Sequence, residues 1–339
     1  MKPIFRVAAA FSALALFVAT AHFLRLGGSG APDFTTAPIM KGAPEVVIEI
    51  PRGATGSSIA QQLEDAGVVK SSEALFRTFV GDKRSSRIAP GAHRLTLRIS
   101  AKQALEQLLD NDRIPGLISI FEGEWNTEVI ESMRLSGFAL SEVQKALRSV
   151  KLPAGFTTSE GLLFPAHYSF AKGVSATTAV QEMVSRGIYE AKSAGIFSSS
   201  EKLTPQQLLT IASIIQQEGS LEDFSKISRV IRNRLQIGMR LQLDSTVHYI
   251  KNKRGSVFLS TQSTLVASPF NTYQRYGLPP SPIGNPGSAA MKAAVHPATG
   301  DWLYFITVKP GDTRFTTTLS EFNTWKIEYK KNLAAGAFK

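Results

Sequence analysis

The periodic spacing of apolar residues predicts one well-defined helix between Thr204 and Gly219. Thr204 suits the N-cap, and Pro205 suits the first helical position, where no backbone N–H is needed. The apolar positions recur at helical spacing, at Leu208, Ile211, Ala212 and Ile215. The same face then reaches Glu218, and Gly219 offers a C-cap. The pattern therefore places a carboxylate at the end of the face that the helix buries.

Two interpretations of Glu218 remain open at this point. A buried carboxyl without a cationic partner keeps its proton, because desolvation disfavours the charged form. A general acid near neutral pH needs that property. The alternative places Glu218 in water at a frayed helix end, and spacing alone does not decide between the two.

The chain before this helix repeats one order of elements. The pattern predicts a β-α-α-β-α unit that starts at Glu45, and a similar unit contains Ile118, which stands 70 positions after Ile48. The matching positions are Gly53 with Gly123, Gly67 with Gly137, Gly91 with Gly161 and, after a small insertion, Ser100 with Ser175. A degenerate internal duplication explains this order, and chance similarity is the alternative. The strand–helix–helix part of the first unit also resembles LysM-type modules, which bind glycans that contain N-acetylglucosamine.

The N-terminus carries the signal for export. Lys2 and Arg6 precede the apolar segment 7–24, which is 18 residues long and just able to span a bilayer. Basic residues before such a segment favour a cytoplasmic N-terminus and an exported body. A cleaved signal peptide with a site near 19–21 is the alternative. Both interpretations place the rest of the chain outside the cytoplasmic membrane.

Charge and composition narrow the chemistry. The 339 residues include no cysteine, so disulfides, thiolate catalysis and cysteine–zinc sites are excluded. The net charge of +11 favours anionic partners such as a membrane surface or an anionic glycan. Dense basic runs with interleaved aromatic residues are missing, so we expect no nucleic-acid partner.

Several catalytic signatures are also missing. We find no Walker A loop, no dinucleotide-binding glycine pattern, no HExxH and no GxSxG. The five histidines show no metal-ligand spacing, so we expect neither metal nor cofactor. What remains is a carboxylate within a region rich in polar residues that suit sugar hydroxyl and acetamido groups. The candidate substrate contacts are Asn233, Gln242, Asp244, Asn271 and Tyr273.

An ordinary glycosidase needs two carboxylates across the scissile bond. The candidate second acids are Glu160, Glu222, Asp223 and Asp244, and none of them stands out. A lytic transglycosylase needs a single carboxyl, because the sugar's own C6 hydroxyl attacks C1. A two-carboxylate muramidase that uses Asp244 or Glu160, and a peptidoglycan-binding scaffold without activity, are the alternatives.

A set of ordered motifs resembles the endolytic murein transglycosylase family (YceG-like, or MltG) over residues from about 45 to 330. The matching pieces are Glu160–Pro165 with Tyr168, Ile211–Ile215 with Glu218, Asn233–Leu235, Gly238–Met239, Leu241–Gln242, Asp244, Asn271–Tyr273, Gly277–Pro280, Asn285–Gly287 and Leu303–Phe305. The resemblance implies that Glu218 is the catalytic acid and then the base. It also implies a single-pass membrane protein with a LysM-like part, which cuts glycan strands internally and leaves 1,6-anhydro-N-acetylmuramic ends.

The chain departs from the family pattern at three places. Ala166, Ser245 and Phe322 stand where members of the family often have Asp, Pro and His. These differences weaken any catalytic role for the three positions and leave Glu218 unaffected.

The combined expectation is an α+β protein that works beside the synthases which extend peptidoglycan. Its substrate would be the peptidoglycan glycan strand, its body would be extracytoplasmic, and Asn285 would hold its own loop. The expected parts are a membrane anchor (1–26), a flexible linker (27–44), a LysM-like module (45–112), a second related module with the Glu160–Pro165 motif (113–186), a catalytic domain around a central catalytic helix (187–332) and a tail (333–339).

Overall fold

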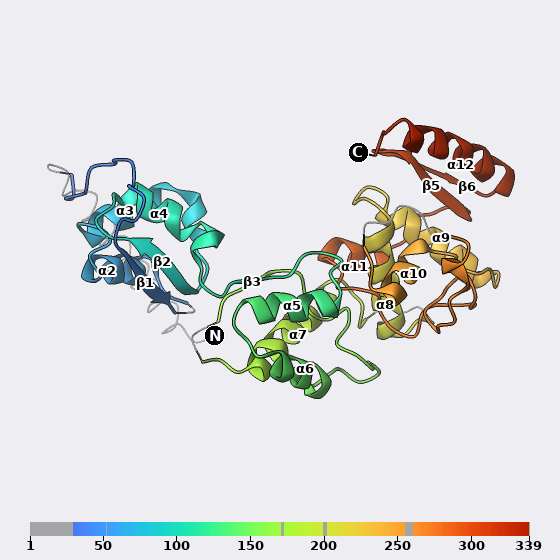
Figure 1. Cartoon of the computed structure of the whole chain (residues 1–339), viewed down its shortest axis with the longest axis horizontal. Helices are drawn as coiled ribbons and strands as arrows, with labels where there is room; N and C mark the ends of the chain where they lie inside the picture. The colour runs from blue at the N-terminus through green and yellow to red at the C-terminus, as the bar shows by residue number, and fades with distance from the viewer. Residues whose placement is uncertain (1–29, 52, 171–172, 199–201, 255–259, 339) are drawn as a thin grey trace, which may run out of the picture. The chain divides into compact units, whose positions relative to one another are not determined.

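The computed structural model describes residues 30–51, 53–170, 173–198, 202–254 and 260–338. The chain divides into two compact units, residues 1–115 and 116–339. Figure 1 shows the helices and strands of both. The division lies close to the boundary that the sequence predicts between residues 112 and 113.

The first unit contains a two-stranded antiparallel sheet with helices packed against it. Its elements are β1 (Glu45–Ile50), α2 (Gly56–Asp65), α3 (Ser72–Gly81), η1 (Lys83–Arg87), β2 (Gly91–Thr96), α4 (Ala101–Leu108) and η2 (Asn111–Arg113). Residue pairs join β1 and β2 along their whole length, from Glu45–Thr96 to Ile50–Gly91. Leu63 and Leu75 are fully buried between the helices. The expected β-α-α-β order is present, and the likeness to LysM modules stays a prediction.

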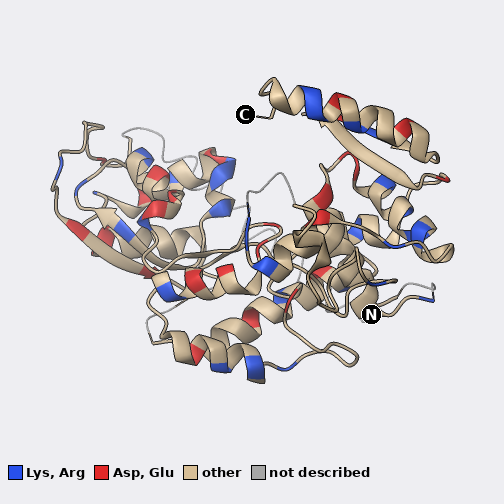
Figure 2. Ribbon diagram, turned by 45° about the vertical axis from the view of Figure 1, so that its right-hand side comes forward, with Lys and Arg blue, Asp and Glu red and all other residues tan. Residues whose placement is uncertain are grey.

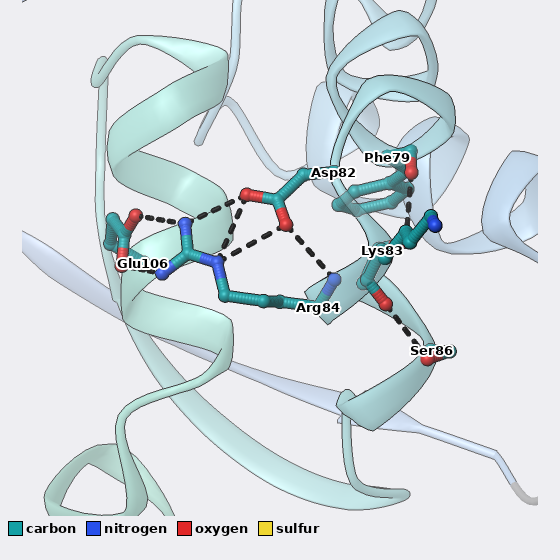
Figure 3. Close-up of polar contacts among 7 residues, drawn as sticks. Phe79, Asp82, Lys83, Arg84, Ser86 and Glu106 are labelled. Atoms are coloured by element: carbon teal, nitrogen blue, oxygen red, sulfur yellow. Dashed lines mark hydrogen bonds and ion pairs between the residues drawn. The ribbon is translucent and has the colours of Figure 1, made fainter.

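Arg84 joins the end of α3 to α4 through two carboxylates (Figure 3). Its Nη2 atom lies 2.7 Å from Asp82 Oδ2 and 2.6 Å from Glu106 Oε1. The Ser85 hydroxyl donates to the Phe79 carbonyl oxygen at 2.8 Å. The charged groups reach solvent, and exposed ion pairs contribute little to stability. The cluster therefore fixes a local turn.

The second unit contains the remaining elements, mostly helices around three short hairpins. They are β3 (Ile118–Ser119), α5 (Asn126–Leu135), α6 (Leu140–Ser149), β4 (His167–Tyr168), α7 (Ala176–Ser193), α8 (Pro205–Glu218), α9 (Phe224–Gln236), α10 (Asp244–Lys251), η3 (Ser263–Leu265), α11 (Ser288–Val295), β5 (Tyr304–Lys309), β6 (Asp312–Thr316) and α12 (Leu319–Ala334). The described residues thus form an α+β fold, as the sequence predicts.

The β-α-α-β-α order of the first unit recurs from β3 to α7. Strand pairing corrects the predicted match of Gly161 with Gly91. Ile48 pairs with His93 in the first hairpin, and Ile118 pairs with Tyr168 in the second. The offset between the copies is therefore 70 positions at the first strand and 75 at the second. The extra residues precede β4, and Gly161 lies in this added loop.

The predicted boundary between residues 186 and 187 falls inside helix α7. One hydrophobic core runs from Ile118 to Ala294, so the second copy and the following helices are packed as one body. Gly187 explains part of this packing, since a Cβ atom there would lie 2.1 Å from the carbonyl oxygen of Leu162. The second module and the catalytic region therefore share a core.

Helix α8 lies at the centre of that core, between α9, α10 and α11. Its N-terminus has the predicted cap: Thr204 accepts from the Gln207 N–H, and the Gln207 side chain accepts from the Thr204 N–H. All residues from Leu208 to Ile215 are buried, so the helix is covered on every side rather than along one stripe. Gly219 is extended (φ −154°), not left-handed. A Cβ atom there would lie 2.2 Å from Ile227 Cδ1, so close packing requires this glycine.

The C-terminal part forms a separate layer of the second unit. Helix α12 lies along the β5–β6 hairpin (Figure 1). The Asn332 amide donates to the Val308 carbonyl at 2.9 Å, and Arg314 pairs with Glu328 at 2.8 Å. These contacts fix the rotation of α12 about its axis.

The predicted membrane anchor (1–26) lies outside the described residues. Among the helices of the described ranges, none has the length and apolar character needed to cross a membrane.

Candidate active site

Glu218 is the last residue of α8 and lies half-buried where this helix leaves the core. Its Oε1 accepts a hydrogen bond from the Ser245 N–H at 3.2 Å. Ser245 belongs to the first turn of α10, so the N-terminus of a second helix faces the carboxylate. Glu218 therefore does not lie free in water at a frayed end. Partial positive charge at a helix N-terminus favours an anion there.

The polar residues of the last turns of α8 hold the surrounding loops. The Ser213 hydroxyl accepts from the Ile283 N–H, and Gln216 Oε1 accepts from the Gly287 N–H. The neighbouring Gln217 amide donates to the Gly123 carbonyl at 2.6 Å. The helix that ends in Glu218 thus also anchors the walls near it, which keeps the carboxyl in a fixed position.

Glu218 opens into a cleft of about 1110 Å³. Its walls are formed mostly by polar and aromatic residues, from Trp125 just before α5 to Phe338 just after α12. They are Trp125, Gln217, Glu218, Arg234, Gln242, Leu243, Asp244, Ser245, His248, Arg254, Thr261, Thr264, Tyr273, Phe305, Ile306, Thr307, Phe322, Lys326, Tyr329, Lys330 and Phe338. A cleft of this size accommodates several sugar units of an extended polymer.

Burial raises the pKa of the Glu218 carboxyl, and the negative charge of Asp244 adds to this effect. Ser245 and the Arg234 guanidinium act in the opposite direction without cancelling it. The carboxyl therefore keeps its proton to a higher pH than an exposed glutamate does, which suits a general acid.

Asp244 and Tyr273 form a second polar pair in the same cleft. The Tyr273 hydroxyl donates to Asp244 Oδ1, which fixes the carboxylate at the start of α10. Burial, together with Asp244, raises the pKa of Tyr273, so the phenol remains a donor. Gln242 is exposed on the cleft wall in a left-handed conformation (φ 47°). Three of the five predicted substrate contacts therefore reach the cleft.

The other two predicted contacts support loops and are not in the cleft wall. The Asn233 amide donates to the carbonyl oxygens of Gly300 and Trp302. Asn271 is 0% exposed, and its amide donates to the carbonyl oxygens of Thr264 and Val266. Both side chains have the hydrogen-bonding groups expected of sugar contacts, but backbone atoms already occupy them.

Asn285 has the structural role that the sequence predicts, but its side chain holds other segments instead of its own loop. It is fully buried, and its Oδ1 accepts from the N–H groups of Gly161 and Leu163, both at 3.0 Å. Its Nδ2 donates to the Glu124 carbonyl at 2.9 Å. The loop with the Glu160–Pro165 motif is thus tied to the proline-rich loop beside α8.

Glu160 is a strongly buried carboxyl, at 5% exposure. Its Oε1 accepts from the Asn126 N–H at 3.0 Å, and its Oε2 accepts from the Tyr249 hydroxyl at 3.1 Å. Burial raises its pKa to about 7. Glu160, Glu222 and Asp223 are not in the wall of the cleft, so Asp244 is the candidate second acid that shares it with Glu218.

Arg234 is a site residue that the sequence reasoning did not single out. It is 7% exposed, and its guanidinium donates to the carbonyl oxygens of Leu303 and Leu241. It also lies 5.4 Å from the centre of the Tyr304 ring. The signal was present, because Arg234 continues the apolar stripe of Ile227, Val230 and Ile231 in α9, just as Glu218 continues the stripe in α8.

The three departures from the family pattern have structural explanations of different kinds. The Ala166 carbonyl accepts from the Ile120 N–H beside the β3–β4 hairpin. The Phe322 ring packs 5.5 Å from the Tyr304 ring at the cleft. Ser245 contributes the N–H that Glu218 accepts, which a proline could not supply. In the described ranges, no group of three His, Asp or Glu side chains is placed to hold a metal ion.

Comparison with known proteins places this arrangement in a family. The YceG-like family model matches residues 48–327. The endolytic murein transglycosylase of Bacillus subtilis (strain 168) is 30% identical over 318 residues, which cover 86% of this chain and 87% of that protein. An enzyme of the same name from Streptococcus pneumoniae (strain R6) is 27% identical over 301 residues, which cover 77% of this chain and 54% of that protein.

A solved structure gives the same result. The 2.6 Å crystal structure of a putative YceG-like protein from Listeria monocytogenes has a TM-score of 0.56 and 29% sequence identity with this chain. The match covers 84% of this chain and 99% of the Listeria chain. The chain therefore belongs to the YceG-like family.

Proposed function

We propose that this chain is an endolytic murein transglycosylase whose acid and base is Glu218. The names of its curated relatives support cleavage within peptidoglycan glycan strands. The observation that carries the residue assignment is the placement of Glu218. It combines burial, a raised pKa, a backbone N–H on one oxygen and an opening into a large cleft.

The reaction needs one carboxyl in two protonation states. Neutral Glu218 donates its proton to the glycosidic oxygen between N-acetylmuramic acid and N-acetylglucosamine, and the C1–O bond breaks. The C6 hydroxyl of the same muramic residue attacks C1 and forms a 1,6-anhydro ring. The Glu218 carboxylate takes up the hydroxyl proton, so the enzyme returns to its starting state without consuming water. The attack is intramolecular, and correct positioning therefore supplies much of the acceleration.

Neighbouring groups support both states of Glu218. The raised pKa favours the acid at the first step. The Ser245 N–H and the Arg234 charge stabilise the carboxylate that forms afterwards. Asp244, held by Tyr273, offers a negative charge to the cationic character that develops at C1. Gln242 is the remaining candidate sugar contact, whereas Asn233 and Asn271 act as loop supports.

The N-terminal parts would place this activity at the wall. Segment 7–24 would anchor the chain in the cytoplasmic membrane with its body outside, and the β-α-α-β module of the first unit would bind glycan as LysM modules do. An enzyme anchored there would work beside the peptidoglycan synthases, because the growing strand emerges at the same membrane. A pull-down of residues 30–115 on purified peptidoglycan tests the LysM-like assignment. Failure of this segment to bind would contradict it.

A two-carboxylate hydrolase is the second candidate, because Asp244 lines the same cleft as Glu218. Mass spectrometry of strands digested with the purified protein separates the candidates. The proposed chemistry leaves 1,6-anhydro-N-acetylmuramic ends. Reducing ends would establish the hydrolase, and intact strands would establish a binding scaffold.

A further inference from the structure

One wall of the cleft is a regular row of side chains on α12. Phe322, Lys326 and Lys330 stand four residues apart, so they lie on one face of the helix, and all three line the cleft. Tyr329 lies beside them, and burial, with a smaller contribution from the Asp244 charge, raises the pKa of its phenol. The face of α12 that carries these lysines is thus turned toward the region of Asp244 and Glu218. Figure 2 shows acidic and basic positions along this helix.

The rotation of α12 is fixed by contacts on the cleft-facing side and on its other faces. Arg314 binds Glu328 at 2.8 Å, and the Asn332 amide binds the Val308 carbonyl. The Phe322 ring packs on Tyr304, which in turn lies over Arg234. The two lysines therefore face the cleft because of the packing of the helix, not because of a chance rotamer.

In the part of the chain that the structure describes, the two arginines of the cleft wall, unlike these lysines, have partners within the protein. Arg234 donates to two backbone carbonyls. Arg254 pairs with Glu128 at 2.5 Å and lies 4.0 Å over the Trp125 ring. Within the described ranges, no ion pair or hydrogen bond is recorded for the side chains of Lys326 and Lys330. These two ammonium groups are exposed at the edge of the cleft, ready for an external anion.

We propose that Lys326 and Lys330 form a subsite for the carboxylates of the peptide stems that the murein strand carries. The inference rests on the proposed function, because it takes murein as the polymer in the cleft. The sugar rings offer no charge to a lysine, whereas the peptide stems carry free carboxylates. A lysine ammonium is a rotatable point charge, which suits a mobile carboxylate better than a rigid fork does. The enzyme should therefore prefer strands whose stems retain their charge.

The experiment compares two forms of one substrate. Carbodiimide coupling with ammonia converts the free stem carboxylates to amides and leaves the peptides and the glycan in place. We expect the native chain to have a kcat/KM about tenfold higher on untreated strands, mainly through KM, as two partly exposed ion pairs allow. The preference should fall as salt is added, because such pairs are screened.

The double variant K326Q/K330Q tests whether these two lysines cause the preference for charged stems. We expect it to cleave both substrates with nearly equal kcat/KM, because the charge contacts are gone. K331Q is the matched control, since Lys331 is exposed on the same helix and is not in the cleft wall; it should keep the native preference. A native chain without preference, or a double variant that keeps it, overturns the proposal.

Failure of the proposed cleavage is distinguishable from failure of the subsite. Pull-down of the two strand types by the native chain and by K326Q/K330Q measures the same preference without catalysis. A preference in binding that disappears in the double variant supports the lysine subsite, even where no strand is cut. Equal binding of both strand types by the native chain refutes it.

Discussion

Glu218 and Glu160, two carboxyls of the second unit whose pKa is raised by burial, differ in what surrounds their oxygens. Glu160 is enclosed, with one oxygen on the Asn126 N–H and the other on the Tyr249 hydroxyl. Glu218 has Oε1 on the Ser245 N–H and lines an open cleft. A perturbed pKa alone therefore does not identify the acid, because access to substrate separates the two residues.

The surroundings of the two carboxyls indicate different roles for them. Glu160 links the N-terminus of α5, the motif loop and α10, so its hydrogen bonds hold the elements that carry the cleft. Glu218 occupies the end of a helix in which every residue from Leu208 to Ile215 is buried, and its side chain meets the cleft. One carboxyl supports the architecture, and the other performs the chemistry.

The largest expected effect comes from the same neutral substitution at both positions. Glu218→Gln should lower the rate of strand cleavage by about a thousandfold or more, because no acid remains to protonate the leaving oxygen. Glu160→Gln, which keeps an acceptor for Asn126 and a partner for Tyr249, should retain most of the activity. Chromatographic release of soluble muropeptides measures both rates. A Glu218→Gln protein of native activity would refute the assignment.

The second prediction concerns Glu160 and the stability of the fold. The folded-state pKa of about 7 lies above the ordinary value of 4.5, so the folded protein binds the proton more tightly than the unfolded chain. The free energy of unfolding should thus fall as pH rises from 4.5 to 7, by on the order of 3 kcal/mol from this residue.

Glu160→Gln provides the control for that prediction, because Gln resembles the protonated form and cannot titrate. Its unfolding curves in urea should lose this part of the decrease between the two pH values. An identical pH dependence for the variant and the native chain would contradict the raised pKa of Glu160.

The third prediction asks whether Asp244 is a second catalytic carboxylate. In a single-carboxyl mechanism it stabilises charge, so Asp244→Asn should lower kcat about ten- to a hundredfold. Tyr273→Phe removes the hydrogen bond that orients Asp244 and should cost about tenfold or less. A loss in Asp244→Asn as large as that in Glu218→Gln, together with reducing ends in the products, would favour the hydrolase.

The smallest effect is expected at Ser245, through the pH profile. Ser245→Pro removes the N–H that Glu218 accepts, so the pKa of the carboxyl should rise. The alkaline limb of kcat/KM, which reports the acid form of Glu218, should then move upward by roughly half a unit. Ser245→Ala keeps the N–H and should leave the limb closer to its native position. A downward shift in the proline variant would contradict the role of this hydrogen bond.

Short sequence patterns were sufficient to predict helix starts, helix spacing and the order of elements. The Thr204 cap and the apolar spacing predicted α8 to its last residue, and the predicted match of Ser100 with Ser175 agrees with their positions as the N-caps of α4 and α7. The order of elements in the two copies could be read in the same way. Each of these features depends on residues close together in the sequence.

The hydrogen bonds and packing of individual side chains could not be read from the sequence. Asn233 and Asn271 resemble sugar contacts in composition, but their amides donate to backbone carbonyls, at Trp302 for Asn233 and at Val266, just before it in the chain, for Asn271. Gly161 was matched to Gly91 by identity, whereas strand pairing places it in an added loop against Pro282. The lysines of α12 reach the cleft only through the packing of that helix on β5 and β6.

The most direct test of the account is the pKa of the Glu218 carboxyl in the folded protein. Carbon-detected NMR titration of glutamate side chains, with Glu218→Gln used to identify the resonance, measures it without reference to substrate. We expect a pKa above the ordinary value of 4.5, so that a protonated fraction is available for the glycosidic oxygen. A pKa at or below 4.5 would contradict the assignment of Glu218 as a buried general acid.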